Sequence, residues 1–195
     1  MKKIICLFIG LIMVLSFAGC KNNKTEETKK PTLETDASGV DIVKYVKAGE
    51  MPEASYSVGY DVNKIEQELA EKEDSSFEKN EGETYTTFMV IKEVDDSPEN
   101  IQYIYETDHP ENGIKYIVSF TKSYGFENDM DPNTVSETMA SKGQTASLKA
   151  IPNDLIQFVP ASRDCDCLTY NISGYSLNFI FDSNYLAATI LYKKG

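Results

Sequence analysis

The sequence of 195 residues holds a single histidine, His109, and lacks the glycine-rich signatures of common catalytic and nucleotide sites. A Ser-His-Asp triad would depend on that one histidine, and no Gly-x-Ser-x-Gly accompanies it. A Walker A loop and a dinucleotide-binding fingerprint are also missing. Paired carboxylates could hydrolyse a glycosidic bond, but 31 acidic residues single out no pair. We therefore predict no catalytic residue, no metal ligand and no cofactor.

Basic residues are scarce, with 19 lysines and arginines against 31 aspartates and glutamates, a net charge of −12. The first nineteen residues hold two lysines and no acid, so the chain from Cys20 onward has a net charge of −14. Nucleic-acid binding needs a basic surface, and we therefore predict no nucleic-acid partner. The charge also disfavours docking on anionic lipid, and we expect it chiefly to keep the domain soluble.

The chain has one long apolar run, residues 4–17, broken by Gly10 and Ser16. It is shorter than the roughly 20 residues that cross a bilayer as a helix, which disfavours an uncleaved membrane anchor. Lys2 and Lys3 precede the run, and the small residues Ala18 and Gly19 follow it. A positive start, a short apolar core and a small-residue exit predict a secretory signal peptide over residues 1–19.

The end of this segment, Phe17-Ala18-Gly19-Cys20, resembles the lipobox of bacterial lipoproteins, with Phe17 where leucine is usual. The resemblance implies cleavage before Cys20 and a diacylglyceryl group on its thiol. Two acyl chains anchor a protein stably, whereas one anchors it only weakly. We therefore expect a secreted chain held by lipid on the outer face of the cell membrane, or on the outer membrane.

Residues 20–40 comprise this cysteine and a stretch rich in Lys, Asn, Thr, Glu, Ser and Pro, which cannot bury enough apolar surface to order itself. It predicts a flexible tether that spans roughly 25 Å. Residues 41–195 remain for a folded domain, which could consist of two halves, about 55–124 and 125–195.

Two helices are indicated by their capping residues. The segment 61–73 has Asp61 as N-cap and apolar residues at helical spacing. The second helix has Asp131 as N-cap, Pro132 in its first turn and Gly143 near its end, with Val135 and Met139 on one side. The segment 41–54 fits either a short helix or a strand.

Alternating apolar residues and turn-forming dipeptides predict a series of strands. We expect them over residues 85–91, 101–107, 114–122, 147–151, 155–159, 167–172, 175–181 and 185–192. Residues 95–100, 109–113, 173–174 and 182–184 are the predicted turns. Two buried faces are expected, one formed by Ile114, Tyr116, Val118 and Phe120 and the other by Tyr175, Leu177, Phe179 and Phe181.

The predicted fold class is α+β, an antiparallel sheet with helices packed on one face. The order of helix and strands recurs, and Gly59-Tyr60 before one helix echoes Gly125-Phe126 before the next, which suggests a tandem repeat. This order, together with the line from Tyr175 to Asp182, resembles the beta-lactamase-inhibitor-protein-like repeat and related outer-membrane assembly lipoproteins. A single α+β domain without a true repeat is the alternative.

The cluster Cys165-Asp166-Cys167 could form a disulfide, hold a metal or consist of reduced structural thiols. Along a strand the two Cβ atoms would lie roughly 6 to 7 Å apart, too far for a disulfide, so a bridge requires a tight turn here. A zinc site would need two further ligands, and redox catalysis usually employs Cys-x-x-Cys.

Two further patterns favour structural roles. The segment 129–133 resembles the start of a calcium loop, but Thr134 stands where glycine belongs and Ala140 where a bidentate glutamate belongs, so capping by Asp131 is the better interpretation. Tyrosines at strand positions could line a ligand surface but more often cover a sheet. The tyrosines concerned are Tyr103, Tyr105, Tyr116, Tyr124, Tyr170 and Tyr175.

Three hypotheses follow for the function. The first is a non-enzymatic lipoprotein of the cell envelope whose sheet binds a protein or a peptide. The second is an extracellular enzyme that acts on cell-wall or other external substrate with carboxylates or the Cys165/Cys167 pair. The third is metal capture by that pair.

Overall fold

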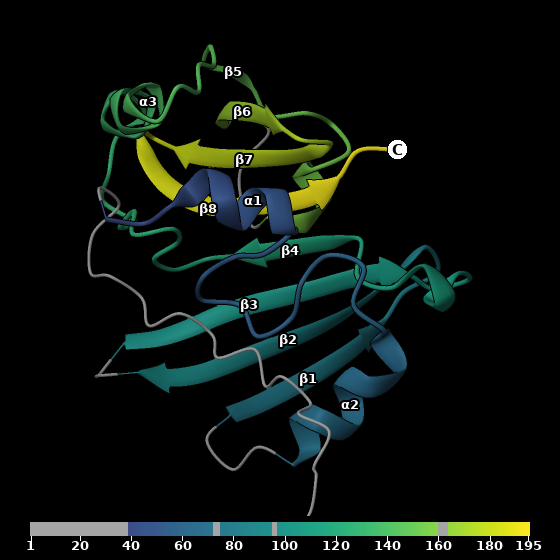
Figure 1. Ribbon diagram of the computed structural model, residues 1–195. Helices are drawn as coiled ribbons and strands as arrows, with labels where there is room; N and C mark the ends of the chain where they lie inside the picture. Colours follow the sequence, from purple (N-terminus) through teal and green to yellow (C-terminus); the bar gives the residue numbers. More distant parts are fainter. Residues whose placement is uncertain (1–38, 72–74, 95–96, 160–163) are drawn as a thin grey trace, which may run out of the picture. The chain divides into compact units, whose positions relative to one another are not determined.

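The computed structural model describes residues 39–71, 75–94, 97–159 and 164–195 (Figure 1). The predicted signal peptide, Cys20 and most of the predicted tether lie outside these residues. Eight strands form one sheet in the order β1-β2-β3-β4-β8-β7-β6-β5, and every pairing is antiparallel. The strands are β1 (Ser75–Glu81), β2 (Tyr85–Val94), β3 (Ser97–Glu106), β4 (Tyr116–Ser119), β5 (Lys149–Ala150), β6 (Asp166–Ile172), β7 (Tyr175–Asp182) and β8 (Tyr185–Lys193).

One pairing joins strands that do not follow one another in the chain. β4 pairs with β8 over four residue pairs, from Tyr116 opposite Tyr192 to Ser119 opposite Thr189. All other neighbours in the sheet are consecutive strands. We call the β4–β8 ladder the seam, because it joins strands β1 to β4 to strands β5 to β8.

In the described part of the chain, three α-helices accompany the sheet: α1 (Ile42–Ala48), α2 (Val62–Ala70) and α3 (Pro132–Ser141). The predicted N-caps are confirmed, since Asp61 and Asp131 each accept hydrogen bonds from backbone N–H groups of the first helical turn. The ambiguous segment 41–54 begins as a helix, which Gly49 ends with a left-handed φ of 72°. Among the described residues, no helix is both long and apolar enough to cross a bilayer.

All three helices contribute to one hydrophobic core on the same face of the sheet, and the α+β prediction is confirmed. The helices bury Ile42, Val46, Val62, Ile65, Leu69, Val135 and Met139 in it. The strands supply aromatic and branched side chains, including Phe88, Tyr103, Ile117, Leu177, Phe179 and Phe181. Burial of such side chains contributes roughly 1.5–3 kcal/mol each, so this face carries most of the stabilisation.

The second face of the sheet is covered by a stretch without α-helix or long strand, residues 151–159. Its apolar side chains form a smaller core with residues of β3, β4, β7 and β8. The covering residues are Ile151, Leu155, Phe158 and Val159. Strands of both sheet halves are therefore buried on both faces near the seam.

The structure corrects the predicted strand over residues 155–159, which contains a 3-10 helix, Ile156–Phe158. Leu155 and Phe158 point into the second core at a spacing of three residues, which a helical turn satisfies and a strand does not. The strand predicted over 147–151 is confined to Lys149–Ala150.

The turn predicted over residues 95–100 is also too long. β2 and β3 continue pairing as far as Val94 opposite Ser97, because the antiparallel ladder satisfies backbone groups that a wider turn would leave unpaired. β1 was not predicted, since its sequence is polar, as suits an edge strand. Ile114 does not share a face with Tyr116 and Val118 but belongs to the helix-side core.

The strand predicted over 114–122 is confined to Tyr116–Ser119, and the turn predicted over 109–113 contains a 3-10 helix, Pro110–Asn112. The remaining predicted strands and hairpin turns are present. Ser173-Gly174 and Ser183-Asn184 have positive φ, as tight hairpin turns require. The described residues all belong to one compact unit, 31–195. A duplication of two halves, about 55–124 and 125–195, stays a prediction.

Candidate functional site

A cavity opens where the seam ends. Beyond the pair Tyr116–Tyr192, the N–H of Lys115 donates to the carbonyl of Ile104, at 2.8 Å. On the other side, the N–H of Lys194 donates to the carbonyl of Gly174, also at 2.8 Å. Beyond the seam, the chain before β4 thus stays bonded to β3, and the chain after β8 stays bonded to the turn before β7. β4 and β8 therefore diverge at this point. We call the gap between Ile114–Lys115 and Lys193–Gly195 the fork.

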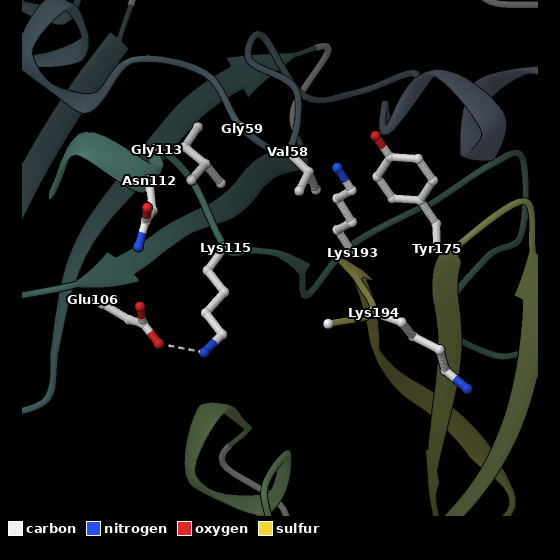
Figure 2. Close-up of a pocket in the computed structure, with 11 residues that line it drawn as sticks. Val58, Gly59, Glu106, Asn112, Gly113, Lys115, Tyr175, Lys193 and Lys194 are labelled. Carbon is white, nitrogen blue, oxygen red and sulfur yellow. Dashed lines mark hydrogen bonds and ion pairs between the residues drawn. The ribbon is translucent and has the colours of Figure 1, made fainter. Parts of the chain in front are cut away.

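The fork holds a cavity of about 440 Å³, within the range of small-molecule sites (Figure 2). Its polar groups are three lysines, Lys115, Lys193 and Lys194, together with Glu106 and Asn112. Its apolar wall consists of Val58, Ile114 and the ring of Tyr175. Three lysines and one acidic side chain therefore line the cavity together with Gly195, the last residue of the sequence, whereas the chain as a whole is strongly acidic.

One end of the cavity carries an ion pair whose charges neutralise each other. Lys115 Nζ lies 2.5 Å from Glu106 Oε1 and 5.6 Å from the ring centroids of both Tyr85 and Tyr116. The hydrogen bond between Lys115 and Glu106 raises the pKa of Lys115 and lowers the pKa of Glu106. Asn112 also donates a hydrogen bond to Glu106. This end can offer both a donor and an acceptor to a ligand.

The other end is cationic. Lys193 and Lys194 form no ion pair with any of the residues that the structure describes. Lys193 lies opposite Tyr175 across the β7–β8 ladder. Figure 2 shows its ammonium group reaching toward Val58 and Tyr175, while the Lys194 side chain turns away. An anionic group placed here would gain charge-assisted hydrogen bonds.

The wall of the fork is fixed by backbone hydrogen bonds. Val58 N–H donates to the Gly49 carbonyl at 2.8 Å, and Gly59 N–H donates to the Ile114 carbonyl at 2.7 Å. Gly113 has a φ of 73°, and a Cβ there would lie 2.6 Å from the Gly59 carbonyl oxygen. Only glycine allows this approach, so the cavity is preformed.

The loop that leads to this wall is anchored by a buried carboxylate. Glu53 is 6% exposed, and its Oε1 accepts a hydrogen bond from Ser123 Oγ at 2.5 Å. The Tyr124 hydroxyl donates to the carbonyl of Glu50 at 2.7 Å, and Ser55 N–H donates to the Tyr103 hydroxyl at 2.8 Å. These bonds connect the loop to the chain after β4 and to β3.

The structure places Cys165 and Cys167 away from the fork, buried in the second core and not joined in a disulfide. Burial raises the pKa of Cys167 to about 11, so its thiol stays protonated at neutral pH. Nucleophilic attack and metal binding both require the thiolate. Among the described residues, no group of three or more His, Cys, Asp and Glu side chains could hold a metal ion.

The other residues that the sequence singled out have structural contacts. His109 is exposed, with Nδ1 3.1 Å from Glu111 Oε1. Asp131 caps α3, and its Oδ1 accepts from Asn133 N–H at 2.8 Å and from Thr134 N–H at 3.1 Å. Of the six tyrosines considered as a ligand surface, Tyr175 lines the fork and is partly buried. The others, Tyr103, Tyr105, Tyr116, Tyr124 and Tyr170, are buried.

The comparisons with known proteins indicate the fold of this chain and do not indicate an activity. No family model and no curated protein matches this chain. A solved structure does match, that of the DUF4309 family protein YjgB from Bacillus subtilis subsp. subtilis str. 168. The match has 14% sequence identity and a TM-score of 0.50, and it covers 82% of this chain and 100% of that one. The resemblance to beta-lactamase-inhibitor-protein-like repeats and assembly lipoproteins stays a prediction. At this level of identity, the finding is that the chain shares its fold with the DUF4309 protein.

Proposed function

We propose that this chain is a lipoprotein of the cell envelope, lipidated on Cys20, and that its folded part binds an acidic segment of a partner protein or peptide in the fork. One observation carries the binding role: a preformed cavity with an excess of lysines occurs in a chain whose net charge from Cys20 onward is −14. Such a contrast favours anionic ligands at this place and disfavours them elsewhere on the surface.

A peptide segment suits the lining better than a purely charged ligand. The apolar wall of Val58 and Ile114 would pack against side chains, and the Glu106–Lys115 pair would serve backbone amide groups. Ligand sites typically combine an apolar surface with a few placed polar groups in this way. We propose no catalytic step, because His109 and the buried thiols lie outside the fork.

Site-specific photo-cross-linking in intact cells tests this function. A photo-reactive amino acid at Asn112, which lines the fork, is expected to capture a specific partner. The same amino acid at Lys149, exposed in β5 at the far edge of the sheet, is the matched control. The Asn112 product should disappear when Lys193 and Lys194 are both changed to glutamine, since the anionic segment then loses its cations.

Two results would contradict the proposal. One is the same set of products from positions 112 and 149, which would indicate random contact. The other is an Asn112 product that persists in the double glutamine variant, which would mean that the lysines do not hold the partner.

A further inference from the structure

We infer that the fork recognises the free carboxyl terminus of a peptide, with the terminal carboxylate at Lys193 and a backbone N–H of the same peptide at Glu106. This inference rests on the proposed function and names the feature of the partner that the site reads. It follows from the shape of the cavity, from the distribution of charge along it, and from the acceptor that remains at its neutral end.

The shape of the fork accommodates the end of a chain. The fork is closed at its vertex by the pair Tyr116–Tyr192, where the two strands come together in the sheet. It is closed on one side by the backbone of Gly59 and Tyr60, which hydrogen-bonds to both the N–H and the carbonyl of Ile114. The end of a peptide chain can lie against these two boundaries, because it needs only one way out of the fork.

The cationic end suits a carboxylate. Lys193 has no ion-pair partner among the described residues, and its cross-strand neighbour Tyr175 adds a hydroxyl donor on the same face. The phenol ring of Tyr175 sits over Gly49, where a Cβ would lie 2.9 Å from the ring and from its hydroxyl oxygen. Glycine at position 49 therefore leaves room for the ring beside the ammonium group.

At the neutral end of the cavity, the Glu106 carboxylate is a hydrogen-bond acceptor that a simple anion would not need. An ionised carboxylate has about four acceptor positions. Lys115 and Asn112 donate to Glu106, so acceptor capacity remains for one more N–H group. An anion without a donor, such as sulfate, would meet the negative charge of Glu106 and gain nothing there. A peptide terminus offers both required groups, a carboxylate and an amide N–H.

The test compares two pools of N-acetylated tetrapeptides, randomised at all four positions, that differ only in a free or an amidated carboxyl terminus. Binding to the isotope-labelled chain from Cys20 onward, with Cys20 changed to serine, is followed by NMR. The free-acid pool should shift the backbone amides of Gly59 and Lys193. The amidated pool should bind at least about tenfold more weakly, because it lacks the charge-assisted bond.

Variants assign the two contacts. Lys193→Gln should reduce the affinity for the free-acid pool to that for the amidated pool and leave the latter unchanged. Glu106→Gln should weaken the binding of both pools, because both contain the backbone N–H that donates to Glu106. Lys149→Gln, at the far edge of the sheet, should change neither. The amide spectrum of each variant without peptide verifies its fold.

Other outcomes would overturn the inference. Equal binding of the two pools would refute recognition of a terminus but leave the proposed function, with an internal acidic segment as the ligand. Stronger shifts of the same amides by inorganic phosphate would replace the peptide with a phosphate ligand. If neither pool binds while the Asn112 cross-link depends on Lys193 and Lys194, this inference alone fails. If that dependence is also missing, the proposed function fails with it.

Discussion

At the scale of single residues, the buried carboxylate of Glu53 depends on the donors that surround it. Ser123→Ala removes the hydroxyl that donates to Glu53 Oε1 and leaves a buried carboxyl oxygen with one partner fewer. We expect the free energy of unfolding to fall by roughly 1–3 kcal/mol, the cost of an unsatisfied buried polar group. Urea denaturation measures it. Ser141→Ala is the matched control, since that hydroxyl donates to the Thr138 carbonyl at the surface and its loss should cost much less.

Asp131 makes the stability of α3 dependent on pH. Hydrogen bonds from the Thr134 N–H and hydroxyl and from the Asn133 N–H lower the pKa of Asp131 in the folded chain. Its contribution is therefore complete above the unfolded value, about 3.9, and is lost as the pH falls through the lower folded pKa.

Asp131→Ala should accordingly lower the urea midpoint at neutral pH, and the gap to the unchanged protein should narrow at about pH 2. Asp131→Asn, which keeps a capping oxygen, should lose less than the alanine variant at neutral pH. A gap that stays constant with pH would mean that the ionised carboxylate is not what caps the helix.

At the scale of elements, the fork depends on how closely two backbone segments approach. Gly113→Ala would place a Cβ 2.6 Å from the Gly59 carbonyl oxygen, in a residue whose φ is 73°. Gly143 is a matched control, since its φ is 75° but a Cβ there meets nothing within 4 Å.

Both substitutions incur the strain of a positive φ, of the order of 1–3 kcal/mol. Gly113→Ala should lose more, because a ψ of −166° places Gly113 in a region that essentially only glycine adopts and because Gly59 must also move. Thermal unfolding measures the difference. In the NMR assay, Gly113→Ala should also shift the amide of Gly59, whereas Gly143→Ala should not. Equal losses from the two variants would show that the contact between the segments is not tight.

Which elements the sequence predicts depends on whether their signals are local. Asp61, Asp131 and the Ser173-Gly174 turn act within a few residues of themselves, and the corresponding elements are confirmed. β1 has no apolar alternation, because only one of its edges is paired and its side chains are largely exposed. The short apolar run at 155–159 fits two periodicities, and the shape of the second core selects the helical one.

The candidate site was not predictable for a related reason. Lys115 directly precedes β4 and Lys193 ends β8, far apart in the sequence, and they border one cavity because β4 and β8 pair and then part. No spacing within the sequence encodes that divergence. The cysteine pair stood out by its rarity, yet the structure buries both thiols in the second core.

At the scale of the whole molecule, the lipid on Cys20 is expected to be the attachment to the membrane. Cys20→Ser should move the protein from the membrane fraction to the soluble one, because an acidic domain has little attraction for anionic lipid of its own. Fractionation of cells followed by immunoblotting measures this. The folded part should be unaffected, so the thermal midpoint of the released chain is the control. Retention in the membrane fraction would point to an uncleaved apolar segment instead.

The seam has a consequence for the order in which the sheet assembles. Each of the other pairings in the sheet joins consecutive strands, whereas Tyr116 and Tyr192 must meet across a long intervening chain. Loop closure of that length is entropically costly, so the two sets of hairpins form early and the seam closes late. The seam has only four residue pairs, and side chains buried on both faces of the sheet hold it closed. A peptide bound in the fork would touch both arms and slow any opening of the seam, so the occupied protein would resist hydrogen exchange at Ile117 and Leu191 longer than the empty one.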